Sequence, residues 1–125
     1  MKLVIVDDDK DITYSIATAL KEIDKSIEVL EANSGKECLK LLKTEKPDLI
    51  LLDVMMPEMN GWELSIALKA NKDTCNIPIV FLTCLDDPGC KRMGLTFGVD
   101  YLTKPFEAKE LHKIITKILK LKLKN

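Results

Sequence analysis

Five short apolar runs, fairly evenly spaced along the chain, constrain the fold of this protein more than any other feature. Most are continuous rather than alternating, which is typical of parallel strands that are buried on both faces of a sheet. The runs cover residues 3–6, 27–30, 49–52, 79–82 and, more weakly, 101–102. Segments with helical apolar spacing separate them. The alternation predicts a (βα)₅ chain, in which a doubly wound sheet of five parallel strands carries helices on both faces.

Capping residues predict where several of the helices begin. Ser34 with Glu37, and Asn60 with Glu63, have the spacing of a capping box, in which two side chains satisfy backbone N–H groups at a helix start. The fourth expected helix, at residues 87–96, is the least regular, because each of its two glycines costs about 1 kcal/mol relative to alanine. The sequence therefore predicts well-defined starts for the second and third helices and a weaker fourth helix.

Length and charge exclude several classes of protein. The chain has 125 residues, which suits one domain. We expect residues 1–120 to form it and residues 121–125 to be a helix end or the start of a linker to an absent output domain. The formal net charge is −1 and opposite charges are mixed along the chain, which argues against direct binding of nucleic acid. No apolar stretch is long enough to span a membrane and no signal peptide is recognisable, so a cytoplasmic protein is expected.

Neither the cysteines nor the histidine form a metal or redox motif. The four cysteines lack C-x-x-C spacing and adjacent histidines, so we interpret them as reduced residues that mostly serve packing. His112 is the only histidine and lies in a helical stretch, where a surface position is expected. These residues therefore predict neither a zinc site nor a histidine-based catalytic dyad.

Candidate site residues follow the first, third, fourth and fifth predicted strands. They are Asp7, Asp8 and Asp9 after the first strand, Asp53 after the third, Thr83 after the fourth, and Lys104 and Pro105 after the fifth. Because the carboxyl ends of parallel strands meet at one edge of the sheet, we expect these groups to converge. Carboxylates so close together repel each other unless a cation lies among them, and an all-oxygen ligand set suits Mg²⁺. No glycine-rich phosphate-binding motif is present, which argues against a dinucleotide site.

Four segments, "VIVDDD", "LLDVMMPEMNG", "VFLT" and "YLTKPF", occur in order and each lies at the end of a predicted strand. Together they resemble the receiver domain of two-component response regulators, over nearly the whole chain. The resemblance implies a flavodoxin-like fold. It also implies a regulatory domain rather than an enzyme, in which Asp53 accepts a phosphoryl group from a phosphohistidine on a sensor histidine kinase or a phosphotransfer protein.

The resemblance also implies the ligands of the metal. Asp8 would bind Mg²⁺ directly, and Asp7 would act largely through water. Asp53 would contribute a carboxylate oxygen and Met55 its backbone carbonyl, so that the side chain of Met55 need not be polar. Mn²⁺ could replace Mg²⁺ at such a site. Asp9 is not expected to be a ligand, and we interpret it as an acid at a helix start.

Further residues are assigned by the same resemblance. Lys104 would pair with the phosphoryl group, and the Lys104–Pro105 bond is cis in the family. Thr83 would move to bond the phosphoryl group, and Tyr101 would then turn inward. This shift would alter the face made by the fourth helix, fifth strand and fifth helix, and so control a downstream effector or an output domain. The loop at 98–101 is one residue shorter than is usual in the family. This difference affects the expected movement of Tyr101 more than the phosphorylation chemistry.

Apolar residues surround the expected phosphoryl site. Met55 and Leu85 flank the path of an attacking water in the family, and neither can orient or activate that water. Slow self-dephosphorylation is therefore predicted. Cys84 occupies a position where the family favours a smaller residue, and it would narrow the access to the phosphoryl group.

Two other functions compete with this interpretation. A phosphatase of the haloacid-dehalogenase type also uses a strand-end aspartate and Mg²⁺, but it needs a second acid where this chain has Met55. A phosphorylation-independent interaction module on the same fold is the remaining alternative. The complete set of acids, threonine and lysine argues against it, because such a module has no need of a costly charge cluster.

Overall fold

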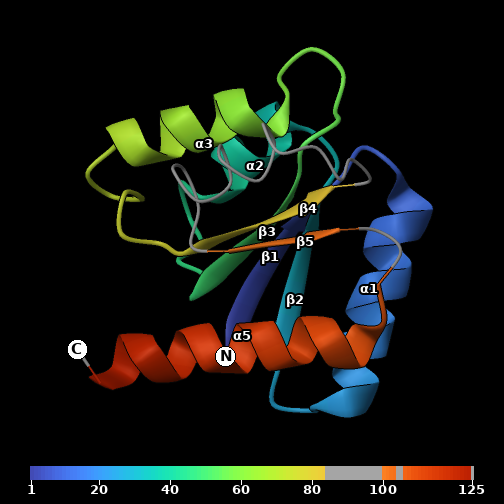
Figure 1. Cartoon of the computed structure of the whole chain (residues 1–125). Coiled ribbons are helices and arrows are strands. Elements are labelled where there is room, and N and C mark those ends of the chain that lie inside the picture. The colour runs from blue at the N-terminus through green and yellow to red at the C-terminus, as the bar shows by residue number, and fades with distance from the viewer. Residues whose placement is uncertain (84–99, 104–105, 125) are drawn as a thin grey trace.

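A sheet of five parallel strands lies at the centre of the protein, in the order β2-β1-β3-β4-β5 (Figure 1). The computed structural model of the chain describes residues 1–83, 100–103 and 106–124. The strands are β1 (Lys2–Val6), β2 (Glu28–Ala32), β3 (Leu49–Asp53), β4 (Ile79–Thr83) and β5 (Asp100–Thr103). This strand order is the flavodoxin-like one, with its switch point between β1 and β3. The predicted fold class is confirmed.

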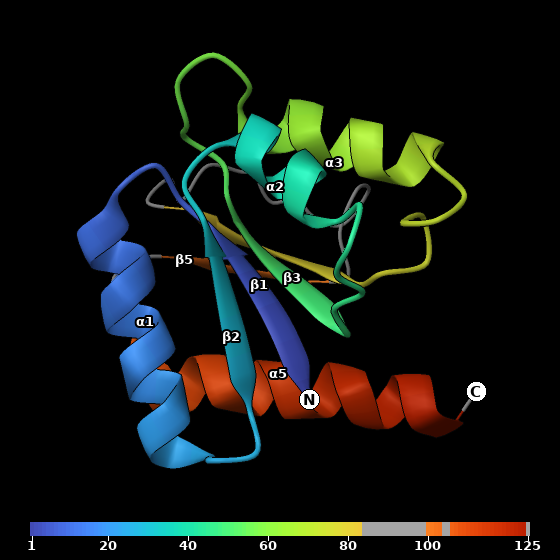
Figure 2. The ribbon, with the colours of Figure 1, turned by 180° about the vertical axis from the view of Figure 1, so that it is seen from behind.

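Four helices in the described part of the chain cover both faces of the sheet. They are α1 (Lys10–Ile23), α2 (Gly35–Leu41), α3 (Gly61–Ala70) and α5 (Ala108–Lys124). The front and back views show α2 and α3 on one face and α1 and α5 on the other (Figures 1 and 2). The helix expected at residues 87–96 lies outside the described residues.

Two apolar cores, one on each face of the sheet, explain why the strand runs are continuous. In β1, Leu3 and Ile5 belong to the core that includes residues of α1 and α5, whereas Val4 and Val6 belong to the core under α2 and α3. Successive side chains of a strand point to opposite faces, so a strand covered on both sides needs an apolar residue at every position. All four of these side chains are fully buried, which confirms the prediction of burial on both faces.

The edge strand β2 differs from its prediction. A strand was expected at residues 27–30, but β2 covers Glu28–Ala32 and so ends two residues later. Among the described strands, β1 alone pairs with it, and Glu28 and Glu31 are exposed along this edge. The apolar run therefore ends before the strand does. The residue that follows β2 is Asn33.

The capping predictions are confirmed at α3 and revised at α2. The side chain of Asn60 accepts from the N–H of Glu63 at 2.9 Å, and the Glu63 carboxylate accepts from the N–H of Asn60 at 3.1 Å. At α2, Ser34 Oγ accepts from the N–H of Glu37 at 3.0 Å. The Glu37 carboxylate, however, accepts from the N–H of Asn33 at 2.7 Å and so reaches one residue beyond Ser34.

Two cysteines lie in the described residues, and neither forms a disulfide. Cys38 lies on the buried face of α2, and burial raises the pKa of its thiol to about 12, so that it stays protonated at neutral pH. Cys75 is half-buried. Cys84 and Cys90 lie outside the described residues. Within those ranges, no helix has the length and apolar character needed to cross a membrane.

Candidate functional site

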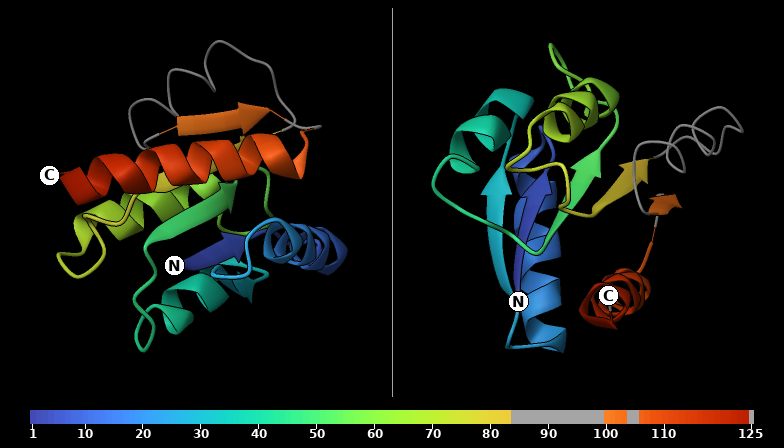
Figure 3. Two further views of the ribbon diagram at one scale, coloured as in Figure 1. Left: turned by 90° about the horizontal axis from the view of Figure 1, so that it is seen from below. Right: turned by 90° about the vertical axis from the view of Figure 1, so that its left-hand side faces the viewer.

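Three carboxylates meet at the carboxyl-terminal edge of the sheet. Asp7 and Asp8 follow β1, and Asp53 is the last residue of β3. These two strands are neighbours and run in the same direction, as the arrows in the left view of Figure 3 show. One carboxylate oxygen from each of the three acids lies within 4.8 Å of the others. Asp7 and Asp53 are buried whereas Asp8 is exposed, so the cluster is reached from solvent beside Asp8.

The donor set of this cluster fits a hard divalent cation. The three acids offer carboxylate oxygens, which Mg²⁺ prefers, and no histidine or cysteine of the described residues belongs to the group. Two unit charges 4.8 Å apart repel each other, and a cation among them would relieve that repulsion. Met55 comes two residues after Asp53, and its predicted contribution is its backbone carbonyl, because a thioether is too soft a ligand for Mg²⁺.

Asp7 is held by hydrogen bonds with the end of β2 and the residue after it, and with the β1–α1 loop. The N–H of Asp7 donates to the Ala32 carbonyl at 3.1 Å, and the N–H of Asp9 donates to Asp7 Oδ1 at 3.0 Å. The Asn33 amide donates to the Asp7 carbonyl at 2.8 Å. Asp9 is the N-cap of α1, as predicted for an acid at a helix start.

Asn33 is the functional candidate that the sequence interpretation missed. Candidate residues are predicted after four of the five strands but not after the second, whose predicted end lies two residues too early. Counting from the true end of β2, at Ala32, would have pointed to Asn33.

The backbone directly after Asp53 is held by the neighbouring strand β4 and by the first residue of α3. The N–H of Val54 donates to the Leu82 carbonyl at 3.2 Å, and the N–H of Gly61 donates to the Val54 carbonyl at 2.9 Å. The first turn of α3 is therefore packed against the end of β3. A Cβ atom on Gly61 would lie 2.8 Å from Val54 Cα and closer still to the Asp53 carbonyl oxygen. Only glycine fits this approach of one backbone to another.

The structure places the two predicted switch residues on neighbouring strands. Thr83 ends β4, directly after Leu82, which is paired with Asp53. Tyr101 lies on β5, paired with Phe81, and is half-buried against the core under α2 and α3. The remaining predicted site residues lie outside the described part of the chain: Cys84, Leu85, Lys104 and Pro105.

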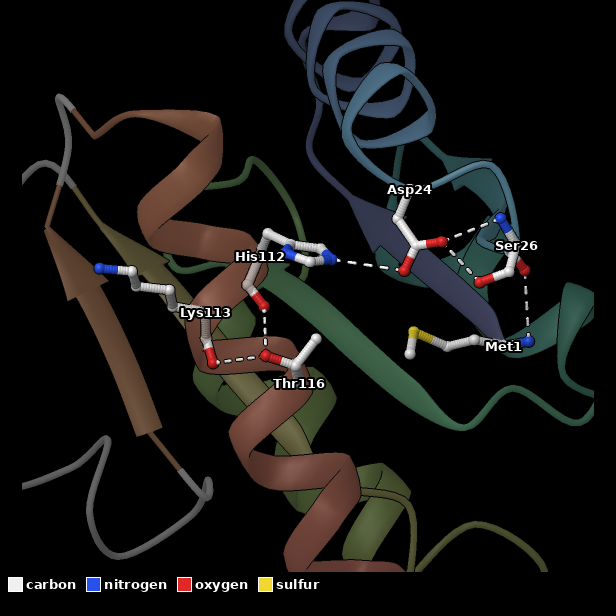
Figure 4. Close-up of polar contacts among 6 residues, drawn as sticks. All are labelled: Met1, Asp24, Ser26, His112, Lys113 and Thr116. Carbon is white, nitrogen blue, oxygen red and sulfur yellow. Dashed lines mark hydrogen bonds and ion pairs between the residues drawn. The ribbon is translucent and has the colours of Figure 1, made fainter.

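His112 lies farther in than the predicted surface position. It is half-buried on α5, and its Nε2 lies 3.4 Å from the carboxylate of Asp24, the C-cap residue of α1 (Figure 4). Asp24 also accepts from the N–H and the hydroxyl of Ser26, at 3.0 and 2.6 Å. Because α1 has 14 residues, a length of about 20 Å separates this contact from the acidic cluster at the other end of the helix. The contact joins α1 to α5 and is not part of the site.

The hydrogen bonds of Asp24 predict that the stability of the protein depends on pH. The hydrogen bonds from Ser26, and then the one involving His112, lower the pKa of Asp24 from its ordinary value of 3.8. A lowered carboxylate pKa stabilises the fold above the unfolded value and loses that effect as the pH falls through the folded value. We expect Asp24→Asn to unfold at lower urea concentration than wild type at pH 7, with the difference narrowing below pH 3.8.

Asp73→Asn is the control for that measurement. Asp73 is exposed, and its carboxylate accepts no hydrogen bond from any described residue. Removing its charge should change the urea midpoint little at either pH. If the difference in urea midpoint between wild type and Asp24→Asn is the same at pH 7 and pH 3, the role assigned to Asp24 is contradicted.

Comparison with known proteins identifies the family. Residues 3–116 match the response regulator receiver domain. The alkaline phosphatase synthesis transcriptional regulatory protein PhoP of Bacillus subtilis is 40% identical over 122 residues, which is 95% of this chain and 48% of PhoP. The phosphate regulon transcriptional regulatory protein PhoB of Pseudomonas aeruginosa is 42% identical over 110 residues, 87% of this chain and 47% of PhoB. The chain thus spans about half the length of these relatives.

Solved structures give the same result. The receiver domain of the Francisella response regulator 1452 superposes with a TM-score of 0.86 at 37% identity, covering 97% of this chain and 98% of that one. The chemotaxis protein CheY4 of Vibrio cholerae gives a TM-score of 0.85 at 30% identity, with coverage of 93% and 96%. The chain belongs to the family of response-regulator receiver domains. Such domains are regulatory rather than classical enzymes, and they interact with histidine kinases and output domains.

Proposed function

We propose that this domain is a phosphoacceptor switch in which Asp53 accepts a phosphoryl group from the phosphohistidine of a sensor histidine kinase or a phosphotransfer protein. One observation carries the proposal: Asp7, Asp8 and Asp53 bring carboxylate oxygens within 4.8 Å of one another at the switch point of the sheet. Asp8 would bind Mg²⁺ directly, Asp7 largely through water, and Asp53 and the Met55 carbonyl would complete the protein ligands.

The chemistry follows from where Asp53 is held. A carboxylate oxygen of Asp53 attacks phosphorus, and an O–P bond forms while the N–P bond to the histidine breaks. The electron pair of that bond returns to the imidazole nitrogen. Such transfers depend on positioning and on neutralising charge rather than on covalent work by the protein. When bound, Mg²⁺ would neutralise the phosphoryl oxygens, and Lys104 would pair with the same group.

The signal would leave the site through the neighbouring strands. We assign Thr83 to bond the new phosphoryl group and Tyr101 to turn inward in response. A phosphoryl dianion at Asp53 would shift the balance of two conformations instead of creating a new fold. The changed face, built from β5, α5 and the segment before them, would act on a downstream effector or on an output domain.

The intact mass of the protein tests this proposal. After incubation with acetyl phosphate, wild type should gain one phosphoryl group in the presence of Mg²⁺ and none in EDTA. Asp53→Asn should gain none in either condition, because an amide is a poor nucleophile. Mg²⁺ binding without any mass gain in wild type would instead support the phosphorylation-independent interaction module.

The phosphoryl group on Asp53 should be long-lived. Met55 is exposed beside the site, and its thioether cannot orient or activate an attacking water. We expect a half-life of minutes or longer for wild type and a shorter half-life for Met55→Gln. The loss of the phosphoryl group can be measured by intact mass after the donor is removed. Ile66→Gln is the matched control, since Ile66 is a similarly exposed apolar residue on α3. A wild-type half-life of seconds would contradict the prediction.

A further inference from the structure

Asn33, the residue after β2, connects three segments of the chain around the acidic cluster. Its Nδ2 donates to the Asp7 carbonyl at 2.8 Å and to Thr13 Oγ1 at 3.3 Å. Its backbone N–H donates to the Glu37 carboxylate on α2 at 2.7 Å. One side chain thereby joins the β2–α2 loop to the β1–α1 loop and to α1.

The second acceptor makes the orientation of the Asn33 amide specific. Thr13 is fully buried, and its hydroxyl donates to the Lys10 carbonyl at 3.1 Å, which leaves its oxygen free to accept from Asn33. The amide nitrogen of Asn33 carries two hydrogens, and each has an acceptor. The amide group is therefore fixed at both of its N–H groups rather than at one.

The Asp7 carbonyl belongs to the peptide group that leads into Asp8. Because that group is planar, the hydrogen bond from Asn33 to the Asp7 carbonyl also fixes the orientation of the Asp8 nitrogen and Cα. The N–H of Asp9, in the peptide group after Asp8, donates to Asp7 Oδ1 at 3.0 Å. Both peptide groups that flank Asp8 are thus held in place.

Asp8 depends on this support because it has little of its own. Its side chain is exposed, and its carboxylate has no hydrogen bond or ion pair with any described residue. Its approach to Asp7 and Asp53 is therefore set by the backbone on either side of it. A ligand that is held in its binding position loses less conformational entropy when the metal binds.

We propose that Asn33 is a positioning residue of the metal site, which orients the Asp7–Asp8 peptide group and so holds the Asp8 carboxylate toward Asp7 and Asp53. The inference rests on the Mg²⁺ site proposed above. Residues that orient metal ligands typically change metal affinity by about 10- to 100-fold when they are replaced. Asn33→Ala should therefore weaken Mg²⁺ binding by about tenfold, at the lower end of that range.

NMR of ¹⁵N-labelled protein tests the proposal in two ways. A titration with MgCl₂ gives the affinity for Mg²⁺, and the exchange of the Asp9 amide with solvent reports how firmly the β1–α1 loop is held. In the metal-free protein, the Asp9 amide of Asn33→Ala should exchange with solvent faster than in wild type, because its acceptor residue Asp7 loses the hydrogen bond to its carbonyl and is held less firmly. Asn71→Ala is the matched control: the Asn71 side chain accepts from the N–H of Asp73 at 2.8 Å, in the loop after α3. It should leave Mg²⁺ affinity and Asp9 exchange unchanged.

The outcomes separate this inference from the proposed function. Weaker Mg²⁺ binding and faster Asp9 exchange in Asn33→Ala, but not in Asn71→Ala, would support the positioning role. Equal Mg²⁺ affinity in wild type and Asn33→Ala would overturn that role and leave the metal site standing. A wild-type protein that binds no Mg²⁺ would overturn both.

Discussion

Gly61→Ala is expected to lower the free energy of unfolding by about 2–3 kcal/mol, near the upper end of typical overpacking costs. The added methyl group would meet backbone atoms of Asp53 and Val54, which cannot rotate away as a side chain can. The contact can relax only if α3 or the end of β3 moves, and Asp53 moves with it. A displacement of about 1 Å can slow a reaction by on the order of 100-fold, so phosphorylation should slow as well. Urea unfolding and the rate of mass gain with acetyl phosphate measure the two effects.

Gly35→Ala is a matched control for this substitution. Gly35 and Gly61 are both the first residue of a helix that follows a side-chain N-cap. A Cβ atom on Gly35 would also be crowded, at 2.7 Å, but by Sδ of Met59, the far end of a flexible side chain. We expect Gly35→Ala to change stability by less than about 1 kcal/mol, since the gain in unfolded-state entropy offsets much of the contact. Equal losses of stability and rate in the two variants would contradict the assigned role of Gly61.

Asp8→Asn should have opposite effects on stability and on metal binding. Unit charges 4.8 Å apart repel by about 1 kcal/mol in water, and Asp8 faces two such charges, so the metal-free variant should be more stable than wild type by about 1–2 kcal/mol. Loss of a direct ligand should weaken Mg²⁺ binding by on the order of 100-fold, at least as much as the loss of a supporting residue. Excess Mg²⁺ stabilises only the protein that binds it, so the order of stabilities should reverse between EDTA and Mg²⁺.

Asp9→Asn is the control at the neighbouring position. It removes the same charge, but asparagine caps a helix about as well as aspartate, and Asp9 is not one of the three clustered acids. The stability of this variant, measured by urea unfolding, should therefore be close to that of wild type both in EDTA and in Mg²⁺. If Asp9→Asn and Asp8→Asn behave alike, the effect comes from the total charge of the loop and not from Asp8 as a ligand.

Much of the architecture could be predicted from the sequence, because a strand buried on both faces must be apolar throughout. The runs that became β1 and β3 satisfy that requirement, and they are the strands that deliver Asp7, Asp8 and Asp53. The meeting of these acids followed from the parallel arrangement alone. The confirmed capping box at α3 rested on an equally local rule.

Other features depend on contacts between segments that no local pattern reveals. The edge position of β2 leaves Glu31 exposed within the strand, which hid its true end and with it Asn33. The contact between His112 and Asp24 joins residues on α5 and at the end of α1, which only the packing of those two helices brings together. The close approach of Gly61 to Asp53 likewise depends on how α3 docks, and "PEMNG" alone reads as an ordinary turn and helix start.

The same edge strand has a consequence for the behaviour of this protein in solution. An unpaired strand edge offers backbone donors and acceptors to any other chain, and natural proteins protect such edges with charge. Glu28 and Glu31 are three positions apart, so their side chains lie on opposite faces of β2. A second copy that tried to extend the sheet at β2 would bring its own carboxylates against these, whichever face it favoured. Glu31, which hid the end of the strand in the sequence, thus also helps Glu28 to protect this edge from self-association into longer sheets.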